Sequence, residues 1–81
     1  MASHTVRLIY PPSLLRVPVI NQLVRRFDLT VNIVHAQIDK QQGWIELQLS
    51  GENVTIEEAI VWLRGKGLEV ESVEKQHEHV E

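Results

Sequence analysis

The sequence predicts an α+β domain in which four antiparallel strands form one sheet and two helices cover one of its faces. Three observations lead to this expectation. The chain has 81 residues, which is the length of one small domain. Four segments alternate apolar and polar residues with the period of a strand, and two others repeat apolar residues with the period of a helix. Their order along the chain is βαββαβ.

The first strand is expected at residues 5–10, where Val6, Leu8 and Tyr10 share one face. Pro11 and Pro12 end it because neither can donate a ladder hydrogen bond. The first helix is expected at residues 18–28. It begins with a proline, and its apolar stripe consists of Val19, Ile20, Leu23, Val24 and Phe27. Leu14 and Leu15 either pack under the preceding loop or extend this helix backward.

The next two strands are expected to form a hairpin. In the first, residues 31–39, strict alternation places Val31, Ile33 and His35 on one face and Asn32, Val34, Ala36 and Ile38 on the other. A polar link at residues 40–43 ends in Gly43, which can adopt a positive φ. In the second strand, residues 44–50, Ile45, Leu47 and Leu49 point inward, whereas Trp44, Glu46 and Gln48 point outward.

Thr55, followed by Glu58 three residues later, resembles a capping box that opens the second helix. Its buried stripe is Ile56, Ala59, Ile60 and Leu63. A left-handed glycine at Gly65 or Gly67 is expected to end the helix. The fourth strand follows with Leu68, Val70 and Ser72 between glutamates, and the polar tail at residues 75–81 is expected to fray.

Two right-handed βαβ crossovers built from these elements give the ferredoxin-like topology. We therefore expect a single domain over residues 1–81 with its core in residues 5–74. One sheet face then has no helix on it. Such a face accommodates a second subunit, a ligand or single-stranded RNA, and the candidates for it are Tyr10, Asn32, Val34 and Trp44.

Composition excludes several classes of function. Eight basic and eleven acidic residues give a formal charge of −3, and no dense Lys/Arg run marks a nucleic-acid-binding surface. The chain has no cysteine, which removes disulfides, cysteine metal sites and thiol catalysis. No apolar stretch approaches the ~20 residues that span a bilayer, and the N-terminus does not resemble a signal peptide. We expect a cytoplasmic protein that binds neither nucleic acid nor membrane.

The sequence indicates no catalytic site and no cofactor. His35 lacks a serine, a cysteine or a paired carboxylate placed to act with it, so an interface role is favoured. His77 and His79 have the spacing of a metal chelate, but a fraying tail would form it at full ordering cost, so a solvated end is favoured. Trp62 is expected to pack against the core. Trp44, on the outward face, is expected to mark an interface.

Several ordered segments resemble the NIL domain, named for an Asn-Ile-Leu tripeptide that here is Asn32-Ile33-Val34. The likeness continues through residues 18–20 in the first helix, Leu49-Ser50-Gly51 after the third strand, and residues 59–63 before residues 67–71. It covers about residues 6–73. The NIL domain is the C-terminal regulatory module of methionine ABC importer ATPase subunits, is similar to ACT domains, and also occurs appended to ferredoxin-type proteins.

The resemblance implies a homodimer that binds methionine near the subunit interface. The family's strand asparagine corresponds to Asn32, whose amide can donate to a carboxylate and accept from an ammonium group. An equally weighted alternative is that Asn32 only satisfies backbone groups at the strand start. The ligand-binding residues implied are Asn32, Ile33, Val34, His35 and Ala36, and the interface residues are Val31, Gln37, Ile38 and Trp44.

This sequence lacks a Walker motif and an ATPase domain, so we expect a free-standing copy. Such a copy either senses a sulfur-containing amino acid and passes the signal to a partner, or serves as a ligand-free adaptor. In the second case, the docking partner would be a ferredoxin, a transporter or an enzyme.

Overall fold

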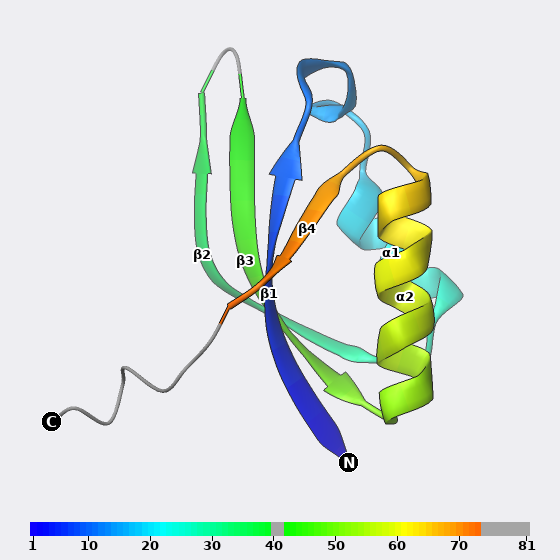
Figure 1. Cartoon of the computed structure of the whole chain (residues 1–81). Coiled ribbons are helices and arrows are strands. Elements are labelled where there is room, and N and C mark those ends of the chain that lie inside the picture. The colour runs from blue at the N-terminus through cyan, green and yellow to red at the C-terminus, as the bar shows by residue number, and fades with distance from the viewer. Residues whose placement is uncertain (40–41, 74–81) are drawn as a thin grey trace, which may run out of the picture.

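The computed structural model describes residues 1–39 and 42–73 and has the predicted architecture. Its elements are β1 (Ala2–Tyr10), the 3-10 turn η1 (Pro12–Leu14), α1 (Val19–Arg26), β2 (Thr30–Ile38), β3 (Gly43–Gly51), α2 (Asn53–Gly65) and β4 (Glu69–Ser72). The four strands form one antiparallel sheet in the order β2-β3-β1-β4. Both helices lie on one side of this sheet, as Figure 1 shows. The expected α+β class with the ferredoxin-like topology is therefore confirmed.

The core lies between the helices and the two central strands. Alternate residues of β1 and β3 point into it, and the helices contribute the opposite wall. The buried set is Val6, Leu8, Tyr10, Val19, Leu23, Ile45, Leu47, Leu49, Ile56, Ala59, Leu63, Leu68 and Val70. The inward faces predicted for β3 and α2 are confirmed, with Ile60 only partly buried. Val6, Leu8 and Tyr10 share one face of β1 as predicted, and that face points into the core, so the placement of Tyr10 on the open face was wrong.

The helix ends differ from the predicted ones. Pro18 caps α1 rather than joining it, and Phe27 is already extended, with φ −122° and ψ 146°. Helix α2 begins at Asn53, two residues before the expected cap, and no side chain caps it. The backbone amide of Ile56 donates to the Glu52 carbonyl (3.0 Å), which places Thr55 inside the first turn. The predicted capping box is therefore wrong.

Two glycines illustrate different constraints. Gly67 has φ +106° and ends the turn after α2, as predicted for one of the two glycines there. Gly43 has no positive φ and is already part of β3, so the expectation for it was wrong. A Cβ on Gly43 would lie 3.0 Å from Leu15 Cδ2 and 3.1 Å from Ile38 Cγ1, so close packing is its constraint.

Residues 40–41 of the hairpin link and residues 74–81 lie outside the described part of the chain. The predicted tail at residues 75–81, with His77 and His79, falls in this range. The last described residue, Val73, donates its amide to the Thr5 carbonyl at 2.9 Å beside β1.

Candidate functional site

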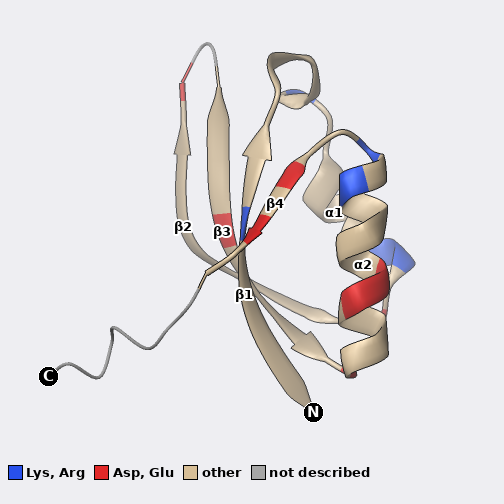
Figure 2. Cartoon of the chain, viewed as in Figure 1, with Lys and Arg blue, Asp and Glu red and all other residues tan. Residues whose placement is uncertain are grey.

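The two edges of the sheet are β2 and β4, and they differ in length and chemistry. Strand β4 has four residues and carries the exposed glutamates Glu69 and Glu71, which are red on β4 in Figure 2. Strand β2 has nine residues, TVNIVHAQI, with no charged residue and no proline. Charge, proline and shortness are devices that keep an edge strand from pairing with other chains. Strand β2 lacks these three devices and carries one other, a β-bulge near its middle.

Strand β2 also exposes apolar side chains. Ile33 and Val34 are each 59% exposed, and Ile38 is 60% exposed. Every residue of the strand except the half-buried Val31 is exposed. An exposed apolar edge of this length is typical of a strand that pairs with another molecule.

A β-bulge at Val34 changes the predicted alternation of β2. The pairing with β3 shifts between Ile33 and His35, so His35 lies opposite Glu46 and Ala36 opposite Ile45. Cross-strand partners share a face, which places Asn32, His35 and Gln37 on the open face beside Gln48, Glu46 and Trp44. Val31, Ile33, Ala36 and Ile38 lie on the helix-covered face. The strict alternation predicted for His35, Ala36 and Ile38 was wrong.

The candidate ligand residues are therefore not brought together into one cavity by one copy of the chain. Asn32 and Ile33 point to opposite faces of β2, and Val34 lies at the bulge between them. No hydrogen bond of the Asn32 side chain occurs within residues 1–39 and 42–73, and that side chain is exposed. The Asn32 side chain is thus available to a second molecule. A ligand could contact both this side chain and its apolar neighbours only along the edge of the strand.

The open face carries a polar cluster around Trp44, which lies on the outward side of β3 as predicted. The Arg7 guanidinium lies 4.7 Å from the centre of the Trp44 ring and 2.7 Å from Glu46 Oε2. The His35 ring is 5.1 Å from the Trp44 ring. The cation–π contact and the ion pair hold the indole in place on the surface. This cluster links β2 to the two central strands.

An apolar pocket at one end of β2 was not predicted. It has a volume of about 220 Å³ and lies between β2, the loop after β1 and the start of α1. Its lining residues are Tyr10, Leu15, Val17, Pro18, Val19, Ile20, Asn21, Ile38 and Ile45. Burial raises the pKa of the Tyr10 phenol above its ordinary value. The sequence left the placement of Leu14 and Leu15 open, and Leu15 is one of the residues that line this pocket.

Asn32 and this pocket cannot hold the same small ligand within one copy. Asn32 pairs with Gln48 and Ile38 with Gly43, so Ile38 lies six positions after Asn32 along β2. At about 3.3 Å per residue, the separation is roughly 20 Å, which exceeds the length of an amino acid. Of the candidate residues, Ile38 lines the pocket and Asn32 does not.

Within the described ranges, no three His, Asp or Glu side chains gather in a way that could hold a metal ion. His77 and His79 lie outside these ranges. Neither helix in the described part of the chain has the length and apolar character needed to cross a membrane.

Comparisons with known proteins point to one family. The model of the NIL domain matches residues 4–72. The methionine import ATP-binding protein MetN 1 of Paraburkholderia xenovorans (strain LB400) is 32% identical over 76 residues, and that of Burkholderia ambifaria has the same identity and coverage. Among solved structures, the C-terminal domain of an ABC transporter/ATP-binding protein from Enterococcus faecalis matches with a TM-score of 0.78. The two share 27% identity over 90% of this chain and 86% of that chain.

The alignment covers 89% of this chain but only 22% of these two import proteins. The chain is thus similar to one domain of these relatives and spans about a fifth of their length.

Proposed function

The chain belongs to the NIL domain family, and from this membership we propose that it is a regulatory binding domain. It pairs with a second copy through β2 and binds a sulfur-containing amino acid, methionine, at the junction. The relatives named above are ATP-binding proteins of methionine import, which supports both the ligand class and an association with a transporter. Because ATP is an intracellular nucleotide, the proposal places the domain on the cytoplasmic side.

The exposed edge of β2 is the main support for pairing between two copies of the chain. Nine residues without charge or proline leave their outer backbone groups unpaired, and Ile33, Val34 and Ile38 expose about three fifths of their surface. Two copies related by a two-fold axis can place these edges side by side, because a two-fold contact uses the same patch on both molecules. The backbone groups then satisfy one another, and the apolar side chains leave water.

The ligand chemistry follows from the residues along the same edge. The Asn32 amide can accept from the ammonium group and donate to the carboxylate of an amino acid. Ile33, Val34 and Ala36 supply apolar surface for a thioether side chain. Since Asn32 and Ile33 lie on opposite faces of β2, a ligand that uses both must lie across the strand edge. A second copy is needed to enclose it there.

A second candidate function uses the same edge without a ligand. An edge strand can add a strand from a different protein, and backbone hydrogen bonds supply most of the affinity in such contacts. The domain would then be an adaptor on a transporter, a ferredoxin or an enzyme. The cluster of the half-buried Arg7 and Trp44 with the exposed His35 favours this candidate because it presents an ordered aromatic surface next to β2.

Isothermal titration calorimetry with L-methionine separates the two functions. The sensing function predicts heat of binding and a rise in the unfolding temperature at millimolar methionine. Asn32→Ala should abolish the heat and keep the fold, whereas the same change at Asn53, exposed at the start of α2, should leave the binding intact. No heat and no thermal shift for the unaltered protein would refute sensing while leaving the adaptor function open.

A further inference from the structure

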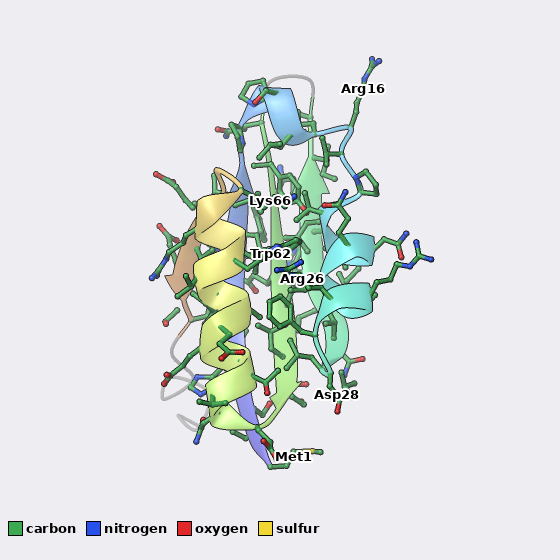
Figure 3. The ribbon with its side chains drawn as sticks, turned by 90° about the vertical axis from the view of Figure 1, so that its right-hand side faces the viewer. Met1, Arg16, Arg26, Asp28, Trp62 and Lys66 are labelled. Carbon is green, nitrogen blue, oxygen red and sulfur yellow. The ribbon has the colours of Figure 1, made fainter. Side chains whose placement is uncertain are left out.

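A groove between the two helices, on the molecular face opposite the open sheet surface, is not used by the proposed function. It is lined by Gln22, Arg25, Arg26, Trp62 and Lys66 and has a volume of about 430 Å³. Figure 3 shows Arg26, Trp62 and Lys66 together in the space between α1 and α2. Three of the chain's eight basic residues thus line one groove, although the chain as a whole is acidic.

The indole of Trp62 organises these cations. The Lys66 ammonium lies 5.1 Å from the centre of its ring, and the Arg26 guanidinium lies 6.0 Å from it. Arg26 is also 5.9 Å from the ring of Phe27, which meets Trp62 edge to face at 5.8 Å. Cation–π contacts of this kind limit the motion of the side chains and keep their charged groups near the ring. The groove therefore presents positive charge at defined positions.

The cations have no acidic partner in the described part of the chain. No Asp or Glu oxygen of residues 1–39 and 42–73 lies within 4.0 Å of Arg25, Arg26 or Lys66, whereas Arg7 has such a partner in Glu46. The C-terminal ends of α1 and α2 lie near these residues and carry about −0.5 charge each. Two helix ends thus supply roughly −1 against three full positive charges. A net positive potential remains in the groove.

Gln22 provides a second, independent observation. Its Oε1 atom is buried at the groove and accepts no hydrogen bond from any described residue. A buried acceptor without a partner costs free energy, so a ligand that brings an N–H donor is favoured here. A peptide main chain supplies that donor, and acidic side chains on the same peptide supply the anions. A free carboxylate lacks such a donor.

From these observations we propose that the interhelical groove docks an acidic segment of a partner protein in an extended conformation. Carboxylates of the segment pair with Arg26 and Lys66, and a main-chain N–H of the segment donates to Gln22 Oε1. A nucleic acid fits less well, because single-strand binding requires a free aromatic face for base stacking. The Trp62 ring is already contacted by Phe27, Arg26 and Lys66. Docking in this groove requires neither the β2 edge nor methionine.

The test measures fluorescence anisotropy of a dye-labelled eight-residue peptide of alternating Glu and Ala with the full chain at low salt. We expect saturable binding that weakens as salt rises, because exposed charge pairs are screened. Arg26→Gln combined with Lys66→Gln should weaken binding about tenfold or more, since two charge-assisted contacts are lost. Both residues are exposed, so circular dichroism and the unfolding temperature should stay near those of the unaltered protein.

Arg16→Gln is the matched control, because Arg16 is exposed, does not line the groove and points away from it in Figure 3. Four results would overturn the proposal. The first is no binding of the acidic peptide, and the second is equal weakening by Arg16→Gln, which would indicate only a general charge effect. The third is stronger binding of an RNA octamer than of the peptide. Complete competition by free glutamate at the peptide's own concentration would also contradict an extended segment.

Discussion

For single residues, features that depend on residues nearby in the sequence could be predicted. Contacts between residues that are far apart in the sequence could not. Gly67 was one of two glycines expected to end α2, and its positive φ agrees with this local reasoning. The groove around Trp62 combines Arg26 with Lys66, which are 40 positions apart, so no run of basic residues marks it in the sequence. The pocket beside Tyr10 escaped prediction for the same reason.

The two glycines at the C-terminal end of α2 allow a matched comparison. Gly67→Ala should lower the free energy of unfolding by about 1 kcal/mol or more, since alanine is disfavoured at positive φ. Gly65→Ala should raise it by about 0.5–1 kcal/mol, because Gly65 lies in the helix and a Cβ there meets nothing within 4 Å. Urea unfolding measures both. Equal effects of the two substitutions would contradict the left-handed assignment of Gly67.

Because Tyr10 is buried, we predict that the free energy of unfolding depends on pH. Burial raises the pKa of its phenol in the folded state, so the folded protein favours the neutral form. The contribution of Tyr10 to the free energy of unfolding is complete below the ordinary tyrosine pKa of about 10. It is lost as the pH rises through the pKa of Tyr10 in the folded state. Urea unfolding between pH 8 and pH 11 measures the loss. Tyr10→Phe should flatten that part of the profile, and an unchanged slope in this variant would assign the loss to other groups.

At the scale of elements, central strands were easier to predict than the edge strand. Residues of β3 alternate between core and open face along the whole strand, and those of β1 do so from Thr5 to Tyr10, because neighbours on both sides constrain the register. Strand β2 has one neighbour, and its bulge at Val34 adds a residue that apolar alternation does not reveal. Its apolar residues on both sides of the bulge fit either register. The predicted division of the β2 faces was therefore wrong, and the location of the candidate site on this strand stays a prediction.

If two copies pair through β2, a charged residue introduced on this edge should weaken self-association. Ile33→Lys should weaken self-association at least about tenfold, because lysine on an edge strand opposes pairing, and each dimer carries two copies of the change. Val61→Lys is the control, because Val61 is 68% exposed on α2 and distant from β2 in the fold. Analytical ultracentrifugation of the two variants compares the association constants. Equal association of both variants would exclude β2 from the interface.

At the scale of the whole molecule, the topology was predictable because each local signal agreed with one arrangement. Short connections and right-handed crossovers leave few ways to order four strands and two helices, and the observed order β2-β3-β1-β4 is the ferredoxin-like one. The use of the surfaces was less predictable. The open face, the β2 edge and the interhelical groove lie on different sides of one small domain (Figures 1 and 3). They are distinguished by the side chains that the fold brings together on each surface.

Sedimentation velocity across a hundredfold dilution, with and without methionine, tests whether β2 joins two copies of the chain. We predict a dimer that dissociates on dilution, with methionine shifting the equilibrium toward the dimer because the ligand binds at the junction. A monomer at every concentration, unchanged by methionine, would rule out pairing through β2.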